Sequence, residues 1–287
     1  MAEFIPWDSQ PLDAWADQHA QGNFIDLDGH QTHYLEQGAG EPVILIHGFL
    51  YDSYLWADNI AALAERFKVY ALDLWGFGYS SREPLAYGYP LFAEQVLRFM
   101  DSLGIERASL VGQSMGGGTA IQFCVRHRDR VNKLLLVASA GLPNQLPLTG
   151  KIFNLPGVGK FLMGLKTDAI RKKNLADLWI HDQAMLTEAY FEQAMRFQKI
   201  QGSSQVMLTI LREQFFNTLS QEIRQLAEMD VPILLVWGRE DKAVPLRLGQ
   251  EMERLLPGSR LEIIDGTGHV PNYERAELFN RLALDFL

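Results

Sequence analysis

The stretch ASLVGQSMGGGTAIQFCVRHRDR, residues 108–130, runs from a short apolar segment into a serine flanked by glycines and then into a segment with helical character. A chain that turns directly from a strand into a helix strains the residue at the turn and crowds the residues two positions away. Gly112 and Gly116 relieve this crowding, and the hydroxyl of Ser114 stays exposed. The pattern G-x-S-x-G between a strand and a helix is typical of a nucleophile, which we therefore expect Ser114 to be. The N–H of Met115, at the positive end of the new helix, is expected to face a developing oxyanion.

On both sides of this stretch, short apolar runs alternate with longer helical patterns, as in a mostly parallel sheet with helices on both faces. The first two runs are close together, and apolar and polar residues alternate along them, which predicts an antiparallel edge. The later runs are continuously apolar, as in strands buried on both faces. The sequence therefore predicts an α/β fold with an eight-stranded, mostly parallel sheet. Strands are expected at 23–27, 31–36, 42–47, 68–73, 108–112, 133–139, 232–237 and 261–265, and helices at 53–67, 90–104, after Ser114, 245–258 and 272–287.

The alternation of strands and helices fails once, between residues 142 and 229, where only amphipathic segments occur. We interpret residues 142–229 as a helical cap inserted into a core that consists of residues 1–141 and 230–287. The cap is rich in Phe, Leu and Met, which suggests an apolar acyl or aryl substrate. Its candidates for the lining of a substrate pocket are Trp179, Phe197 and Phe215.

Composition and charge narrow the class of protein. The chain has 287 residues, of which 47% are hydrophobic, and this is enough for a large core. An amino end with acidic residues and the lack of a long apolar run predict a cytoplasmic protein without a membrane partner. The formal net charge of -9 argues against a nucleic-acid partner. Neither a P-loop nor Cys and His at metal-ligand spacing occurs, so we expect no cofactor and no metal.

One stretch of the cap, residues 150–166, is apolar and carries three lysines. The favoured interpretation is a loop and a helix that pack on the main domain. Action at a lipid interface is the alternative.

A serine hydroxyl is a weak nucleophile unless a base takes its proton. Of the seven histidines, His269 has the placement that a base requires, since it follows the last predicted strand in a glycine-containing loop. Asp241 follows the seventh predicted strand in GREDKAVP and is the candidate for the acid that orients the base. Its neighbour Glu240 is interpreted as a solvated loop residue. The order Ser, Asp, His along the chain is that of an α/β-hydrolase triad.

Several segments together resemble the alpha/beta-hydrolase superfamily, namely VILIHGF, DLWGFGYS, GQSMGG, GREDKAVP and GHVPNYE. The resemblance extends over nearly the whole chain outside the cap. It implies an alpha/beta-hydrolase fold in which the N–H of Phe49 is the second oxyanion donor.

The same segments narrow the subfamily. The loop HGFLYDSYLW is similar to that of haloalkane dehalogenases, but those enzymes have an aspartate nucleophile followed by tryptophan where Ser114 and Met115 stand here. This difference argues against dehalogenation and against epoxide opening. GHVPNYERAELFNRLALDFL and the SMGG core resemble carbon-carbon hydrolases of aromatic meta-cleavage products and related carboxylesterases. The former usually carry Gly-Pro-Gly after the first HG, and this chain has FLYDSYLW.

We therefore expect a serine hydrolase that cleaves carboxylic esters of small to medium apolar acyl or aryl substrates through an acyl-enzyme. Its partner would be a small-molecule ester or a related carbonyl compound. Two alternatives remain open from the sequence. One is a carbon-carbon bond hydrolase of meta-cleavage-type diketones, and the other is a ligand receptor that retains the triad but turns over slowly.

Overall fold

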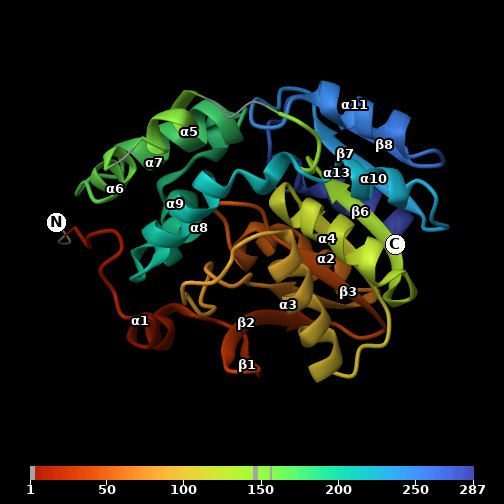
Figure 1. Ribbon diagram of the computed structural model, residues 1–287, viewed down its shortest axis with the longest axis horizontal. Coiled ribbons are helices and arrows are strands. Elements are labelled where there is room, and N and C mark those ends of the chain that lie inside the picture. The colour runs from red at the N-terminus through yellow and green to blue at the C-terminus, as the bar shows by residue number, and fades with distance from the viewer. Residues whose placement is uncertain (1–3, 145–147, 156) are drawn as a thin grey trace.

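A computed structural model of the chain describes residues 4–144, 148–155 and 157–287. Eight strands form one sheet in the order β1-β2-β4-β3-β5-β6-β7-β8 (Figure 1). β2 pairs antiparallel with β1 and β4, and the other neighbours are parallel. The predicted mostly parallel sheet with an antiparallel edge is thus confirmed. Its strands are β1 (Asn23–Leu27), β2 (His30–Gln37), β3 (Glu41–Ile46), β4 (Phe67–Leu72), β5 (Ala108–Gln113), β6 (Val131–Val137), β7 (Ile233–Gly238) and β8 (Arg260–Ile264).

Helices cover both faces of the sheet. α2 (Ala57–Leu63) packs against α13 (Ala276–Phe286) in one layer. In the other layer α4 packs against α3 and α10, and α10 packs against α11. The bounds of this second group are α3 (Tyr89–Ser102), α4 (Met115–Arg126), α10 (Ser220–Leu226) and α11 (Leu246–Leu255). Shorter elements complete the core, namely α1 (Leu12–His19), α12 (Pro271–Glu274), η1 (Ser53–Trp56) and η2 (Arg128–Arg130).

Between β6 and β7 the described residues form short helices and helical turns joined by loops, and their one β-pairing is a bridge from Ile200 to Gln10. In Figure 1 α5 to α9 form the green and teal layer at the upper left, whereas α10 lies with the core helices. The helices are short, and left-handed Gly157 and Gly202 precede two of them. The bounds are α5 (Leu148–Phe153), α6 (Val158–Met163), α7 (Ala169–Asn174), η3 (Leu175–Trp179), η4 (Gln183–Met185), α8 (Glu188–Met195), η5 (Arg196–Lys199), α9 (Ser203–Glu213) and η6 (Phe215–Asn217). Among the described residues, no helix combines the length and the apolar character that a membrane crossing needs.

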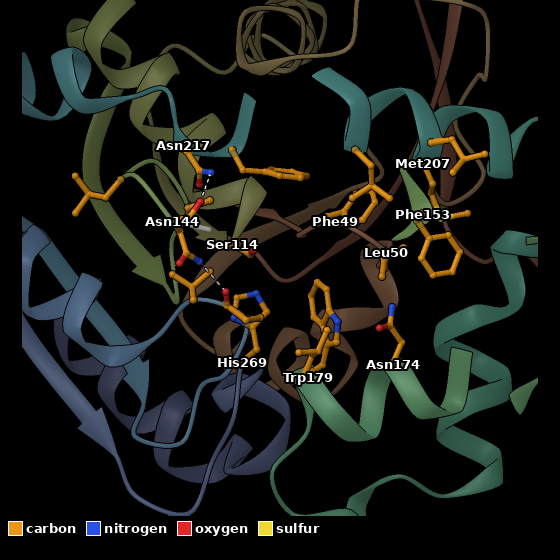
Figure 2. A pocket seen from close by; sticks show the side chains of 18 of the residues that line it. Phe49, Leu50, Ser114, Asn144, Phe153, Asn174, Trp179, Met207, Asn217 and His269 are labelled. Atoms are coloured by element: carbon orange, nitrogen blue, oxygen red, sulfur yellow. Dashed lines mark hydrogen bonds between the residues drawn. The ribbon is translucent and has the colours of Figure 1, made fainter. Parts of the chain in front are cut away.

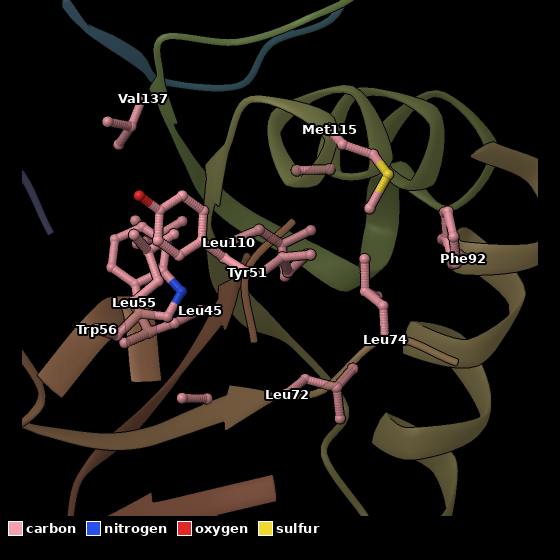
Figure 3. Close-up of a cluster of buried hydrophobic side chains, with 14 of the residues drawn as sticks. Leu45, Tyr51, Leu55, Trp56, Leu72, Leu74, Phe92, Leu110, Met115 and Val137 are labelled. Carbon is pink, nitrogen blue, oxygen red and sulfur yellow. The ribbon is translucent and has the colours of Figure 1, made fainter. Parts of the chain in front are cut away.

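The core lies between the sheet and the helices that cover it. Figure 3 shows Leu45, Leu72 and Leu110 from three neighbouring strands close to side chains of the covering layers. Every residue of β5 and β7 is buried, as expected for strands covered on both faces. The carboxyl ends of β5 and β7 are therefore fixed in place, and these two strands and β8 lead directly into the loops that carry Ser114, Asp241 and His269.

Candidate active site

Ser114 occupies the sharp turn between β5 and α4. Its backbone has φ 52° and ψ -114°, a conformation that L-residues rarely adopt. The Ser114 N–H donates to the carbonyl of Val137 over 2.9 Å, and the Ser114 carbonyl accepts from the N–H of Ala140 over 3.0 Å. The end of β6 thus holds the strained turn from the side.

The glycines around Ser114 are required by close backbone approaches. A Cβ at Gly112 would lie 2.3 Å from the carbonyl oxygen of Gly116, and a Cβ at Gly116 would lie 2.1 Å from the carbonyl oxygen of Ile46. The predicted crowding between Gly112 and Gly116 is therefore present. The second contact also shows that α4 approaches the end of β3, which sequence spacing does not reveal.

His269 and Asp241 meet although 28 positions separate them in the sequence. The Nδ1 atom of His269 lies 2.7 Å from Oδ2 of Asp241, and both side chains are buried. The other carboxylate oxygen, Oδ1, accepts from the N–H groups of Ala243 and Val244, both over 2.8 Å. Each oxygen of Asp241 therefore has a separate task, since one orients the imidazole and the other fixes the loop.

Ser114 and His269 line the same cavity, and Figure 2 shows them at one side of it. Within the described residues, the Ser114 hydroxyl makes no hydrogen bond to the His269 ring in this structure. Hydrogen bonds between a nucleophile and its base are often loose until substrate is present.

Glu240, which the sequence analysis interpreted as a solvated loop residue, connects two loops of the site. It is half-buried, and its Oε2 atom accepts from the N–H of Thr267 over 3.1 Å. The Glu240 N–H donates to the carbonyl of Thr267 over 3.0 Å. Glu240 therefore joins the loop after β7 to the loop that carries His269.

Two backbone N–H groups beside Ser114 are available to an oxyanion. Among the described residues, neither Phe49 nor Met115 has an acceptor for its N–H. The Phe49 loop is close to the serine, because a Cβ at Gly48 would lie 3.0 Å from Cβ of Ser114. Together the two donors can hold negative charge that develops on a carbonyl oxygen at Ser114.

His47 holds the Phe49 loop in place through hydrogen bonds of both ring nitrogens. Its Nε2 atom accepts from the N–H of Leu74 over 3.0 Å, so the ring proton is on Nδ1 and is donated to the carbonyl of Gly48 over 2.8 Å. Burial lowers the pKa of His47. A neutral, fully buried imidazole thus fixes the loop that presents the Phe49 N–H.

The cavity next to Ser114 has a volume of about 150 Å³. An apolar cavity of this order accepts a molecule such as benzene. The described residues of the lining include no Lys, Arg, Asp or Glu, and the polar ones besides Ser114 and His269 are amides (Figure 2). The lining consists of Phe49, Leu50, Ser114, Ala140, Leu142, Asn144, Phe153, Met163, Asn174, Leu178, Trp179, Met207, Leu208, Leu211, Phe216, Asn217, Ala243, Val244 and His269.

Of the three aromatic residues named from the sequence, the structure places one in the lining. The Trp179 ring lies 4.7 Å from the His269 ring, centroid to centroid, and both line the cavity. Phe197 is instead fully buried beside Phe77, and Phe215 packs edge-on against Tyr89 at 4.8 Å. Phe216, the next residue, takes the place at the cavity. Short helical turns send neighbouring side chains in different directions, and composition alone does not tell which one faces the cavity.

Two residues near the site were not found from the sequence. The Gln113 side-chain amide donates to the carbonyl of His269 over 2.9 Å. The Glu274 carboxylate accepts from the N–H groups of Gly268, His181 and Asp182 over 2.6, 2.8 and 2.7 Å. Gln113 could have been noticed from its place beside the serine in GQSMG, whereas nothing in the final helical pattern indicates the role of Glu274.

Within the described ranges, no group of three or more His, Cys, Asp or Glu residues could hold a metal ion. The groups placed together at the cavity are a serine hydroxyl, an imidazole paired with a carboxylate, and two N–H groups without an acceptor among the described residues.

Comparison with known proteins agrees with this geometry. Residues 41–276 match the model of the alpha/beta hydrolase fold family. The chain is 32% identical to the dihydrolipoyllysine-residue acetyltransferase component of an acetoin cleaving system from Cupriavidus necator, over 93% of this chain and 69% of that protein. It is 31% identical to a 2-hydroxy-6-oxo-6-phenylhexa-2,4-dienoate hydrolase of Comamonas testosteroni, over 91% and 93%. A solved meta-cleavage product hydrolase from Pseudomonas fluorescens IP01 superposes with a TM-score of 0.79 at 28% identity, over 92% of this chain and 97% of that one.

Proposed function

Because the chain belongs to the alpha/beta hydrolase fold family, we propose that it is a serine hydrolase that cleaves carboxylic esters of small apolar acyl or aryl groups. Ser114 is the nucleophile, His269 is its base, and Asp241 orients the imidazole. The N–H groups of Phe49 and Met115 form the oxyanion hole. The pairing of His269 with Asp241 beside the cavity that Ser114 lines supports these roles.

In the proposed reaction the Ser114 hydroxyl attacks the ester carbonyl carbon while Nε2 of His269 takes its proton. The two N–H groups hold the oxyanion, and its collapse breaks the bond to the alcohol, which leaves with the proton from His269. Water then attacks the acyl-enzyme with the same base, which releases the acid and restores Ser114. Asp241 keeps the ring proton on Nδ1, so that Nε2 has a lone pair for Ser114.

In this proposal the part of residues 142–229 that precedes α10 acts as the cap of the site, since α10 lies with the core helices. The segment contributes Phe153, Met163, Trp179 and Met207 to the cavity lining. A cap of this kind selects the substrate by its apolar part, while the residues at the strand ends carry out the chemistry.

One observation favours ester cleavage over carbon-carbon cleavage. The substrate named for the Comamonas relative is a dienoate, which carries a carboxylate. A carboxylate that enters an apolar cavity without a cationic partner loses its hydration and gains little in return. Since the described lining has neither Lys nor Arg, the cavity suits neutral substrates.

Carbon-carbon hydrolysis remains the second candidate, because relatives of that activity match the chain over nearly its full length. A slow-turnover receptor is the third. The three functions differ in what they predict for turnover.

The test compares kcat/KM for p-nitrophenyl acetate, butyrate and benzoate with kcat/KM for 2-hydroxy-6-oxo-6-phenylhexa-2,4-dienoate. Burial of an unpaired carboxylate costs about 3 kcal/mol, so we expect the esters to be preferred by roughly 100-fold. A fluorophosphonate probe should also transfer its phosphonyl group to Ser114 with loss of fluoride, which raises the mass of the peptide that contains this residue by that group. Preference for the dienoate would replace our proposal by the second candidate, and one turnover per enzyme molecule would replace it by the third.

A further inference from the structure

Exposed apolar side chains gather on α5, on α6 and on the turn between them. The described residues include seven large hydrophobic side chains that are exposed, and three of them fall within residues 152–161. Ile152 is 40% exposed, Leu155 51% and Phe161 68%. Single exposed apolar residues are common on protein surfaces, but such a group within one short segment is not.

The burial pattern of α6 shows that Phe161 lies on the outer side of that helix. Gly159 and Met163, four positions apart on α6, are both buried. A Cβ at Gly159 would lie 2.6 Å from the Leu208 side chain of α9, and Met163 lines the cavity. Lys160 and Phe161 are exposed on the other side of α6. The inner side of the segment thus packs against α9, which is itself part of residues 142–229, whereas the outer side has no partner among the described residues.

The charge of this outer side is opposite to that of the whole protein. Lys151, Lys160 and Lys166 are exposed along the segment. The chain carries 35 acidic residues and a formal net charge of -9, yet none of the acidic residues lies within 142–167. We name Lys151, Ile152, Leu155, Lys160, Phe161 and Lys166 the outer face.

The amino-terminal segment also has exposed apolar side chains, and it lies next to the end of the outer face. Phe4 and Ile5 are 37% and 41% exposed. The indole of the nearby Trp7 donates to the carbonyl of Thr167 over 3.0 Å, directly after Lys166. Lys199 Nζ lies 4.5 Å from the centroid of the Phe4 ring. Apolar and cationic groups therefore continue past the end of α6.

We propose that the outer face docks this protein on the surface of an anionic lipid bilayer. Apolar side chains flanked by lysines are the composition with which interfacial helices bind such surfaces. Phe153 and Met163 of the same two helices line the cavity, so docking brings the cavity wall to the lipid. Binding does not require the catalytic residues, and the inactive Ser114→Ala variant should bind equally well.

The experiment is flotation with large unilamellar vesicles of phosphatidylcholine, with and without about 30% phosphatidylglycerol. Each lysine near an anionic surface contributes roughly a fivefold gain in binding, so the vesicles with phosphatidylglycerol should bind at least about tenfold more protein. Phe161→Ser and Lys160→Gln should each reduce this binding severalfold. Hydrolysis of p-nitrophenyl acetate and thermal melts should stay unchanged, because neither residue lines the cavity.

Matched control variants make the same two substitutions, Phe to Ser and Lys to Gln, at residues outside the outer face. Phe24→Ser removes a phenylalanine of β1 that is 43% exposed, and Lys68→Gln removes a surface lysine of β4. Both should bind vesicles like the unmodified protein. Equal binding to both kinds of vesicle, or equal losses in Phe161→Ser and Phe24→Ser, would overturn the proposal. So would a Phe161→Ser variant that turns a dimer into a monomer while no vesicle binding is seen.

Discussion

In our proposal the hydroxyl of Ser114 becomes reactive only through the base and the N–H groups beside it. We expect Ser114→Ala to fold normally and to lose kcat by roughly a millionfold, as hydrolases do when their nucleophile is removed. Turnover of p-nitrophenyl butyrate and a thermal melt measure the two properties. Retention of more than a few per cent of activity would show that the nucleophile is another residue.

At Asp241 the structure fixes the outcome of one amide substitution. Oδ1 faces two N–H donors, from Ala243 and Val244, so an asparagine must keep its carbonyl oxygen there and turn its amino group toward His269. The ring would then carry its proton on Nε2, which leaves no lone pair for Ser114. Asp241→Asn should therefore lower kcat by about 10⁴ near neutral pH.

Glu240→Gln is the matched control for Asp241→Asn. It removes the same charge from the same loop, but its amide oxygen can still accept from the N–H of Thr267. We expect kcat to change little, and thermal melts should show both variants to be folded. If the glutamine variant is the inactive one, or if neither change matters, Asp241 is not the orienting acid.

At the scale of the element, the turn from β5 into α4 requires close contacts between backbone atoms, which leave no room for an added side chain. A methyl group at Gly116 would meet the carbonyl of Ile46 in β3, a neighbouring strand. Gly116→Ala should therefore destabilise the protein by at least about 4 kcal/mol in urea unfolding. Gly88→Ala is the control, because its backbone is extended and a Cβ there would have only Pro90 nearby, at 3.6 Å. It should cost about 1 kcal/mol or less, and equal losses would contradict the steric explanation.

The loop that carries His269 is joined to the helical segment by Glu274. Replacement by alanine leaves three N–H groups without their acceptor, which should cost about 3 kcal/mol of stability. The His269 N–H also donates to the carbonyl of Trp179 over 2.7 Å. Glu274→Ala should therefore shift the imidazole and lower kcat by roughly tenfold. Glu274→Gln, which keeps an acceptor oxygen, should recover part of both losses, and a stability loss with unchanged kcat would exclude a positioning role.

At the scale of the whole molecule, a buried ion pair ties the antiparallel edge to the sheet. Nδ1 of His33 in β2 lies 2.6 Å from Oδ2 of Asp73, directly after β4. Asp73 also accepts from the N–H groups of Ser53 and Tyr79 over 2.7 and 2.8 Å. The other ring nitrogen of His33 contacts the carbonyl of Gln21, so both nitrogens face acceptors, an arrangement that favours the cationic form of the ring.

This pair predicts how stability depends on pH. Burial alone would lower the pKa of His33 and raise that of Asp73, but their attraction prevails, so the pKa of His33 is raised and the pKa of Asp73 is lowered. The contribution of a histidine with a raised pKa is full below its ordinary pKa of 6.5 and is lost as pH rises through the folded value. The Asp73 contribution is lost only as pH falls below its ordinary value of 3.8.

We therefore expect His33→Gln to cost about 3 kcal/mol in the free energy of unfolding at pH 6. The difference from the unmodified protein should narrow as the pH rises above 6.5, since only the unmodified protein loses the cation. Urea unfolding of both proteins at several pH values measures this difference in the free energy of unfolding. A difference that is independent of pH would show that His33 is neutral in the folded protein.

Much of this architecture could be predicted from the sequence because its signals are local. Eight apolar runs and their alternation with helical patterns follow from the periodicity of buried strands and half-buried helices. The glycines around Ser114, and the loops after β7 and β8 that carry Asp241 and His269, could also be read along the chain. Parallel strands have their carboxyl ends at the same edge of the sheet. Ser114, Asp241 and His269, which follow three different strands, could therefore be assigned to one site before any distance was known.

Contacts between distant segments were decided by the tertiary structure alone. Phe216 rather than Phe215 faces the cavity because η6 is one short turn whose direction is set by packing against Tyr89. Glu274 and Gln113 support the His269 loop through hydrogen bonds to backbone groups, and any polar side chain of the right reach could do so, which leaves no pattern to read. The sequence determined which residues we propose to bear the chemistry and on which elements they stand. How their side chains are oriented and what lines the cavity depend on close packing between segments far apart in the chain, where a rotation of one short helix replaces one side chain by its neighbour.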